Sequence, residues 1–368
     1  MNTKKYILDR INSGPLFKHF ERDYSVFFLS SMGDTHTVAN QPKYGNGGLT
    51  FAMMTFKNNV CCYYRLEQDN EVYLKNIADN IAKDTSIKDE IFHNYSLACE
   101  KILGIYQQIE VQENFGKSFI ENLSKTINQL IPYQILILHR TDSFVTAFEK
   151  TSEVPDEIYV IRKKYESAFG LFETRFELLC KKIVKKLEDV TVEDLKCLTA
   201  LEIIELMEGG KRPSELIKKR KLLTIVNYLP NVEILTGPDT EVILQAIHDN
   251  ESKYHPSENF TGEIKGKTVF GTGKVIGKCH VISDYDTIEE LKEGEILVVP
   301  STLPKYNNVY KRAKAIITDE GSVLAHASIF CREFKITGIV GTKIATKVLK
   351  DGDLVEVDAD KGIVKIIK

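Results

Sequence analysis

The sequence predicts an α+β protein with more than one domain. Its 368 residues exceed the roughly 100–200 residues of one typical domain. Apolar residues recur at helical spacing from about residue 70 to about residue 247, whereas glycines and short β-branched runs dominate after about residue 260. We therefore expect a hairpin-containing segment over 1–66, a domain of long helices over 67–250, a linker over 251–261 and a β-rich domain over 262–368.

The composition is that of a folded protein with balanced charge. Hydrophobic residues make up 43% of the chain, and 49 Lys and Arg against 52 Asp and Glu give a formal net charge of -3. This balance gives no general electrostatic basis for binding nucleic acid or a membrane, so we expect neither as a partner. No apolar run approaches the roughly 18 residues of a membrane span, and the amino terminus lacks the apolar stretch of a signal peptide. The seven cysteines form no CxxC pair, which indicates free thiols in a cytoplasmic protein.

The first 66 residues contain three strand-like runs. Tyr24–Leu29 is a short aromatic and aliphatic run that predicts a strand. Leu49–Phe56 and Val60–Tyr64 are separated by a Lys-Asn-Asn turn, which predicts a β-hairpin.

Long helices are expected through the middle of the chain. Phe119–Leu138 and Glu157–Leu187 carry apolar residues at helical spacing with little Gly or Pro. Two further helices are expected to begin at Thr191 and at Thr199, where Glu202 completes a capping box, and Gly209-Gly210 is expected to end the second. The basic run at 218–221 (KKRK) is expected to be a solvated helix face.

The C-terminal 107 residues read as a compact β-rich domain. Two helices are expected between its strands, over about 303–313 and over Ser322–Phe334. The predicted strands are seven short runs at 275–276, 280–282, 296–299, 315–318, 339–340, 354–357 and 363–367.

His326 is the candidate catalytic residue. A buried strand at 315–318 leads through a glycine turn into a helix that begins close to His326. The first N–H groups of a helix lack partners within the helix and lie at the positive end of its dipole, so a phosphate is favoured there. The same field disfavours an imidazolium, so we expect His326 to be neutral at pH 7 and able to act as a nucleophile. Arg332 follows six residues later, so it need not share the face of His326.

The segment Ala315–Gly341 resembles the phosphohistidine domain of PEP-utilising enzymes, such as PEP synthase, pyruvate phosphate dikinase and rifampin phosphotransferase. The family signature is approximately T-D-x-G-G-x-[TL]-[SC]-H-[AG]-A-[IV]-x-A-R-E-x-x-I-P-x-V-V-G. The flanking segments at 273–282, 292–306 and 351–366 also resemble this family, and 181–221 resembles the linker that precedes its mobile domain. The matching residues in register are Thr318, Asp319, Gly321, Leu324, His326, Ala327, Ile329, Arg332, Glu333, Ile336, Val340 and Gly341.

The resemblance implies a β/β/α swivelling domain in which His326 carries a phosphoryl group. It implies phosphate-binding roles for Thr318, Gly321, Ser322 and Arg332, and no metal site of the chain's own. Mg²⁺ and ATP or PEP are expected at the site of a partner, an ATP-grasp kinase subunit on a separate polypeptide. The phosphoryl acceptor is expected to be a small molecule such as pyruvate.

The chain departs from the family signature at several positions. Ser322 replaces the second glycine, and Ala325 replaces the small polar residue before the histidine. Ser328 and Cys331 stand at two alanine positions, and Thr337 stands where the signature has proline. An alternative function therefore stays open, namely a non-catalytic relative that binds or regulates a partner enzyme. Phosphorylation of His326 would separate the two.

Overall fold

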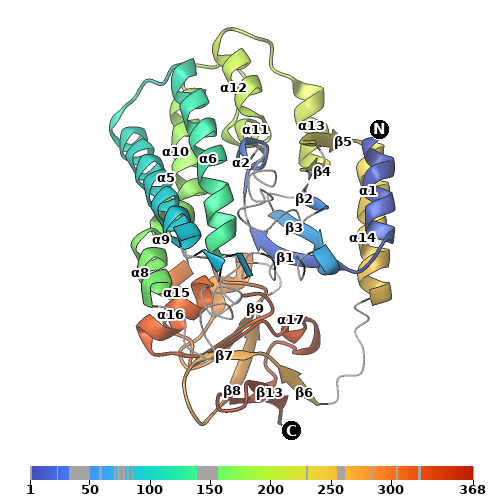
Figure 1. Ribbon diagram of the computed structural model, residues 1–368, viewed down its shortest axis with the longest axis vertical. Helices are drawn as coiled ribbons and strands as arrows, with labels where there is room; N and C mark the ends of the chain where they lie inside the picture. Colours follow the sequence, from blue (N-terminus) through green and yellow to red (C-terminus); the bar gives the residue numbers. More distant parts are fainter. Residues whose placement is uncertain are drawn as a thin grey trace. The chain divides into compact units, whose positions relative to one another are not determined.

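The computed structural model describes residues 2–22, 24–32, 50–57, 60–69, 72, 76, 79–80, 83–84, 86–138, 156–228, 231–254, 262–282, 285–303, 306–321 and 325–367 (Figure 1). The chain divides into two compact units. The N-terminal unit comprises Met1–Glu153 and Lys164–Tyr254, and the C-terminal unit comprises Val154–Lys163 and His255–Lys368.

A five-stranded antiparallel sheet in the order β1-β3-β2-β4-β5 lies in the N-terminal unit. The predicted hairpin is confirmed, since β2 and β3 pair from Ala52 with Arg65 to Lys57 with Val60. The predicted boundary near residue 66 does not separate two units, because β4 and β5 complete the sheet from far along the chain. The strands are β1 (Leu16–Arg22), β2 (Ala52–Lys57), β3 (Val60–Leu66), β4 (Thr224–Asn227) and β5 (Glu233–Thr236).

Two helices from opposite ends of this unit, α1 (Thr3–Asn12) and α14 (Pro238–Tyr254), run side by side against the sheet (Figure 1). Their apolar residues share one buried core with strand residues such as Met53 and Ile225. The buried side chain of Asn250 joins the elements: its Nδ2 donates to the carbonyls of Ile11 (2.7 Å) and Gly14 (2.8 Å), and its Oδ1 accepts from the Leu16 N–H (2.9 Å).

The other described helices of this unit differ from the prediction in two places. The predicted strand at Tyr24–Leu29 is wrong, because Ser25 caps a helix from Val26 and Phe27 stacks on Phe176 with ring centroids 4.4 Å apart. The expected continuous helix over Glu157–Leu187 is broken into three. The helices are α2 (Val26–Ser31), α5 (Ser86–Val111), α6 (Lys117–Leu138), α9 (Glu166–Gly170), α10 (Phe172–Val184), α11 (Val192–Lys196), α12 (Ala200–Met207) and α13 (Ser214–Leu222).

The C-terminal unit is built on an eight-stranded mixed sheet in the order β6-β13-β12-β8-β9-β10-β11-β7. β8, β9, β10 and β11 pair in parallel, and the other pairs are antiparallel. The strands are β6 (Glu263–Lys265), β7 (Lys267–Phe270), β8 (Lys274–Val281), β9 (Ile296–Val299), β10 (Ala315–Thr318), β11 (Thr337–Val340), β12 (Leu354–Asp358) and β13 (Ile363–Ile366).

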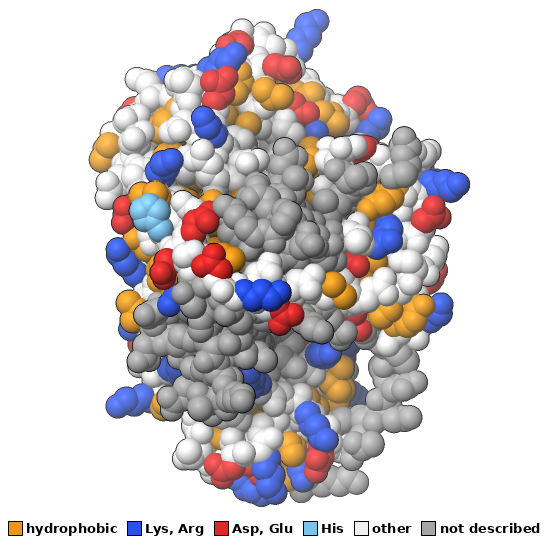
Figure 2. Space-filling view, in the orientation of Figure 1, with side chains coloured by type: hydrophobic (Ala, Val, Ile, Leu, Met, Phe, Trp, Pro, Cys, Tyr) orange, Lys and Arg blue, Asp and Glu red, His pale blue; other side chains and the backbone are white. Residues whose placement is uncertain are grey.

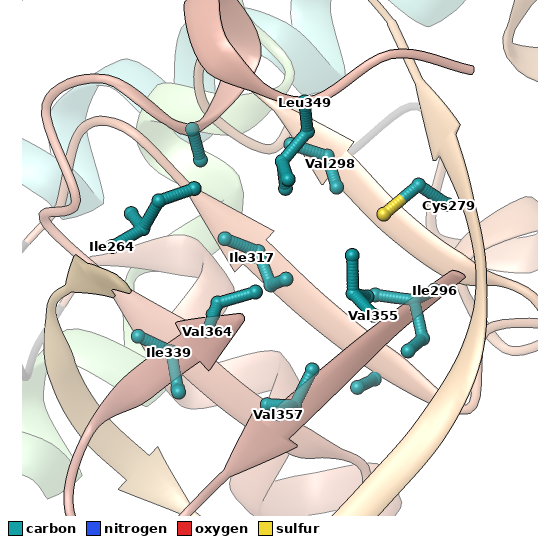
Figure 3. Packing of buried hydrophobic residues seen from close by; sticks show 12 residues of the cluster. Ile264, Cys279, Ile296, Val298, Ile317, Ile339, Leu349, Val355, Val357 and Val364 are labelled. Atoms are coloured by element: carbon teal, nitrogen blue, oxygen red, sulfur yellow. The ribbon is translucent and has the colours of Figure 1, made fainter. Parts of the chain in front are cut away.

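Only Gly266 separates β6 and β7, which are the two outermost strands, so the sheet curls back on itself. A side chain at Gly266 would meet Ile339 and the Val340 carbonyl at 2.5 and 2.9 Å, so this close approach requires glycine. The curled sheet encloses a core of β-branched and aliphatic side chains, including Ile296, Ile317 and Val357 (Figure 3).

Short helices accompany this sheet. They are α8 (Asp156–Lys164), the 3₁₀-helix η2 (Tyr285–Glu290), α15 (Asn307–Tyr310), α16 (His326–Phe334) and α17 (Ala345–Val348). The helix expected over about 303–313 is shorter than predicted, because the N–H groups of Arg312 and Ala313 bond back only three residues, to Val309 and Tyr310.

Lys, Arg, Asp and Glu are interspersed on the face of the molecule in Figure 2, which agrees with the balanced composition. Within the described residues, no helix combines the length and apolar character needed to span a bilayer.

Two capping boxes organise a buried polar network in the N-terminal unit. The predicted boxes at Thr191 and Thr199 are both present, with Asp194 and Glu202 as their acidic members. Asp194 is completely buried and also accepts from Arg212 (2.8 Å) and Lys221 (2.8 Å).

The run at 218–221 is therefore not simply a solvated face. Arg220 is 5% exposed and donates to both carboxylate oxygens of Glu202 (2.5 and 2.9 Å) and to the Cys197 carbonyl (2.9 Å). The carboxylates that begin two helices thus also bind a third helix, α13.

Replacing Asp194 by Asn is expected to lower the free energy of unfolding by about 2 kcal/mol at pH 7. Burial by itself would raise the pKa of Asp194, but hydrogen bonds from Lys221, the Thr191 N–H and Arg212 outweigh it and lower the pKa from 3.8 to about 2. Because the folded-state pKa is depressed, this stabilisation is present above about pH 4 and is lost as the pH falls toward 2. Urea unfolding of the wild type and of the Asp194→Asn variant between pH 7 and pH 3 measures this difference in the free energy of unfolding.

The exposed neighbour Glu193, changed to Gln, is the matched control and is expected to stay within about 0.5 kcal/mol of the wild type. An equal free energy of unfolding for the Asp194→Asn variant and the wild type at pH 7 would contradict the role assigned to this network.

Candidate functional site

The parallel strands of the C-terminal unit bring two distant segments together. Thr318 at the end of β10 pairs with Val299 at the end of β9, so the carboxyl ends of both strands lie at one edge of the sheet. In sheets of this kind, the loops that follow the carboxyl ends are where sites form. The loop after β9 carries Thr302, and the chain after β10 turns into α16 with His326 as its first residue.

The side chains of these two loops meet. Thr302 Oγ1 lies 2.6 Å from His326 Nδ1, a hydrogen-bond distance. Thr302 is 3% exposed, whereas His326 is half-buried. When the imidazole proton is on Nδ1 and donated to Thr302, the lone pair is on Nε2. The contact therefore suits a ring that reacts at Nε2.

Two aromatic side chains lie beside the imidazole. The ring centroids of Tyr310 and Phe330 lie 6.4 and 6.1 Å from that of His326, and 5.7 Å from each other. Tyr310 is itself fixed, because its buried hydroxyl accepts from the Leu303 N–H (2.9 Å), one residue after Thr302. The loop that carries Thr302 and the rings that flank His326 are thus one packed group.

The amino end of α16 carries no capping side chain. Ala325 occupies the N-cap position, and no side-chain hydrogen bond closes the first turn. Helix starts normally place a hydroxyl or carboxylate there, which takes up one of the first N–H groups. With alanine, the positive end of a nine-residue helix lies directly beside the imidazole, an arrangement that favours an anion.

The predicted phosphate-binding residues differ in how well their positions suit contact with a phosphate beside His326. Gly321, three residues after the end of β10, has φ +119°, which favours glycine. Thr318 is completely buried, and its hydroxyl donates to the Glu320 carbonyl. Arg332 lies about 240° around the helix axis from His326, so the two side chains leave α16 on different faces. Ser322 lies outside the described residues.

Asp319, which matches the family signature, is a structural residue. Its carboxylate accepts from the Thr342 hydroxyl (2.8 Å), and from the N–H (3.2 Å) and hydroxyl of Thr346. It therefore ties the end of β10 to the start of α17 and fixes the turn from which His326 follows.

Cys331 is also structural. It is completely buried on α16, and a side chain on Gly338 of β11 would approach its sulfur to 2.6 Å. Burial raises the pKa of Cys331 to about 12, so the thiol stays protonated and unreactive at neutral pH. This cysteine replaces an alanine of the signature as a packing residue.

Thr302 is the functional residue that the sequence did not reveal. It lies within the segment 292–306, whose resemblance to the family is visible, but 24 residues separate it from His326. Only the parallel pairing of β9 with β10 brings them together. Across the described residues, no group of three or more His, Cys, Asp or Glu side chains is placed to hold a metal ion.

Comparison with known proteins agrees with this geometry. The family model of the PEP-utilising enzyme mobile domain matches residues 291–362. Residues 291–362 of the C-terminal unit thus match a PEP-utilising enzyme mobile domain. Thr302, His326 and the strands that position them all lie inside the matched segment of this mobile domain.

Relatives with curated names match over longer stretches of the chain than the family model does. A probable phosphoenolpyruvate synthase of Archaeoglobus fulgidus is 43% identical over 119 residues, which are 31% of this chain and 16% of that protein. Phosphoenolpyruvate synthase of Pyrococcus furiosus is 48% identical over 131 residues (36% and 16%). The uncharacterized phosphotransferase YvkC of Bacillus subtilis is 30% identical over 169 residues (45% and 19%). The matched segments thus span less than a fifth of each of these relatives.

Replacing Thr302 by Val is expected to shift the equilibrium between the two neutral tautomers of His326 about fivefold away from the Nδ1–H form. The reason is the loss of a hydrogen bond worth about 1 kcal/mol from a side chain of nearly the same shape. The ¹⁵N chemical shifts of the His326 ring at mildly alkaline pH report the ratio. Thr302→Ser keeps the hydroxyl and is expected to keep the wild-type ratio, and an unchanged ratio in Thr302→Val would refute the assigned contact.

Proposed function

We propose that this chain is a phosphoryl-transfer component in which Nε2 of His326 takes up a phosphoryl group and passes it on. The observation that supports this most directly is the contact of Nδ1 with Thr302 at the uncapped amino end of α16, within a PEP-utilising mobile domain. The names of the relatives, which are phosphoenolpyruvate synthases and a phosphotransferase, support the same class of reaction.

The proposed step is a direct exchange of bonds at phosphorus. The Nε2 lone pair forms the new P–N bond while the P–O bond of the donor breaks, and the departing oxygen keeps that bond's electron pair. The imidazole keeps its Nδ1 proton, which stays bonded to Thr302, and the helix amino end stabilises the phosphoryl oxygens. In the second half-reaction an acceptor oxygen attacks phosphorus, and Nε2 recovers its lone pair.

We place the phosphoryl donor on a partner, an ATP-grasp kinase subunit that binds Mg²⁺ and ATP or PEP, and we expect the reaction in the cytoplasm. The acceptor is a small molecule such as pyruvate. Of the predicted phosphate-binding residues, Gly321 suits the role best, because it has no side chain and lies four residues before the N-cap of α16. Thr318 would need its hydroxyl turned away from Glu320, and Arg332 would need to reach around the helix.

The linker predicted over 251–261 is the proposed hinge for swivelling. Its first four residues, 251–254, belong to α14 in the structure, and residues 255–261 lie outside the described part of the chain. The boundary between the two compact units falls within this segment, after Tyr254, which supports a hinge there.

The alternative function, a non-catalytic relative that binds a partner enzyme, was suggested by substitutions such as Ala325. In the structure Ala325 leaves the helix end uncapped and the imidazole in contact with Thr302, which favours the phosphoryl-carrying role over the alternative.

The wild-type protein isolated from its own cells is expected to carry one acid-labile phosphate on His326. Intact mass measured without acid before and after mild acid treatment detects it, because a phosphoramidate is labile in acid and a phosphate ester is not. The variant His326→Ala is expected to carry none. His280→Gln is the matched control, since His280 lies on β8 of the same domain and pairs with Asp351 rather than with the site (Nδ1 to Oδ1, 3.1 Å). A wild type that stays unmodified even after incubation with ATP or PEP and cell extract would favour the non-catalytic alternative.

A further inference from the structure

Arg65 is a charged side chain sealed inside the N-terminal unit. It lies on β3 with 0% of its surface exposed, and it is the largest side chain in the described chain to be so completely buried. Burial lowers the pKa of Arg65, but a guanidinium remains protonated at neutral pH in proteins. The structure therefore holds a positive charge in its interior.

The guanidinium has no hydrogen-bond partner among the residues that the structure describes. This is true of Nε, Nη1 and Nη2 alike. The ring of Tyr63 lies below it, 5.0 Å from ring centroid to Cζ, which is a favourable stacking contact but satisfies no N–H.

Asp69 is the carboxylate whose charge acts on Arg65, and it is engaged elsewhere. Its Oδ2 accepts from the Thr50 N–H (2.7 Å), the Thr50 hydroxyl (2.6 Å) and the Phe51 N–H (3.1 Å), with Arg10 at 3.8 Å. These donors hold the carboxylate against the start of β2. Asp69 thus lowers the electrostatic cost of burying Arg65 without binding its N–H groups.

Another buried cation of the same unit, Lys182, has hydrogen-bond acceptors within the chain. Lys182 is 7% exposed, and its Nζ donates to the carbonyls of Ile109 (2.8 Å), Glu110 (3.1 Å) and Gln112 (2.7 Å) at the end of α5. The fold can therefore supply partners to a buried cation. It does so for Lys182, whereas none of the described residues accepts a hydrogen bond from Arg65, and a buried polar group without a partner calls for an explanation.

The residue opposite Arg65 across the sheet is small. In the antiparallel pairing, Ala52 of β2 stands directly opposite Arg65 and so shares its face of the sheet. Its side chain is a single methyl group, while the next pair on that face is Met54 with Tyr63. Arg65 therefore has a small cross-strand neighbour on its face of the sheet.

We propose that the N-terminal unit binds an oxyanion, the carboxylate or phosphate group of a small molecule, at Arg65. The planar fork of guanidinium N–H groups matches both groups in a bidentate manner. Identifying this molecule as the acceptor of the phosphoryl group rests on the proposed function, whereas the anion site does not.

The first test compares stability in chloride buffer without added oxyanions. Neutralising a buried cation that lacks partners is expected to leave the melting temperature unchanged or higher, so Arg65→Met should melt at or above the wild type. Lys182→Met, the matched control, removes a cation with three carbonyl partners and should melt lower. If Arg65→Met melts as low as Lys182→Met, and the wild type does not respond to anions, Arg65 is structural. That result would overturn the proposal.

The second test adds sodium pyruvate or inorganic phosphate at constant ionic strength to the full chain. We expect a saturable rise of at least about 2 °C in the melting temperature of the wild type and none in Arg65→Met, with heat of binding in calorimetry for the wild type alone. A response to pyruvate only identifies a carboxylate ligand, and a response to phosphate only identifies a phosphorylated one. No response to either anion, or an equal response of wild type and variant, would overturn the site.

The variant His326→Ala separates this proposal from the proposed function. It should respond to the anions as the wild type does, because it leaves Arg65 intact. If the wild type binds the anion but never acquires phosphate on His326, the anion site stands and the proposed phosphoryl transfer is refuted. If His326 is phosphorylated but the anion does not bind, only the anion site is refuted.

Discussion

The parallel pairing of β9 with β10 is the constraint on which the rest of the C-terminal unit depends. Because the two strands end in register at Val299 and Thr318, the loops that follow them leave the sheet side by side. One loop brings Thr302 and the other brings His326, and their side chains meet at 2.6 Å. A slip of one residue in this register would turn the strand side chains to the opposite face and separate the pair.

Much of the unit keeps that register in place. The sheet closes through Gly266, where any side chain would collide with β11, and its enclosed face is filled by β-branched residues. Asp319 then fixes the turn after β10 by accepting from Thr342 and Thr346. On α16, Cys331 packs against Gly338, so the helix that begins with His326 is held at its middle as well as at its start.

Local patterns in the sequence were sufficient for part of this picture. The capping boxes at Thr191 and Thr199 were predictable, because each depends on residues only a few positions apart. The helix expected over Ser322–Phe334 is present but begins at His326. The strand predicted at Tyr24–Leu29 was wrong, because its aromatic residues pack against α10 and a serine cap competes with strand pairing. Thr302 could not be assigned, and neither could the burial of Arg220 against Glu202, since each contact joins segments that only the fold brings together. Residue type and spacing show where a helix begins but not which distant side chain meets it.

The rigidity of the site has a consequence for how a phosphoryl group would travel. His326 begins α16, which packs on β11 through Cys331, and its ring contacts Thr302 and lies beside two aromatic side chains. Rotation of the side chain alone moves the imidazole by no more than the reach of that side chain. A phosphoryl group that is received at one site and delivered at another must then move with the whole domain. In the proposed transfer, it is therefore the domain, and not the side chain of His326, that has to move between the two sites.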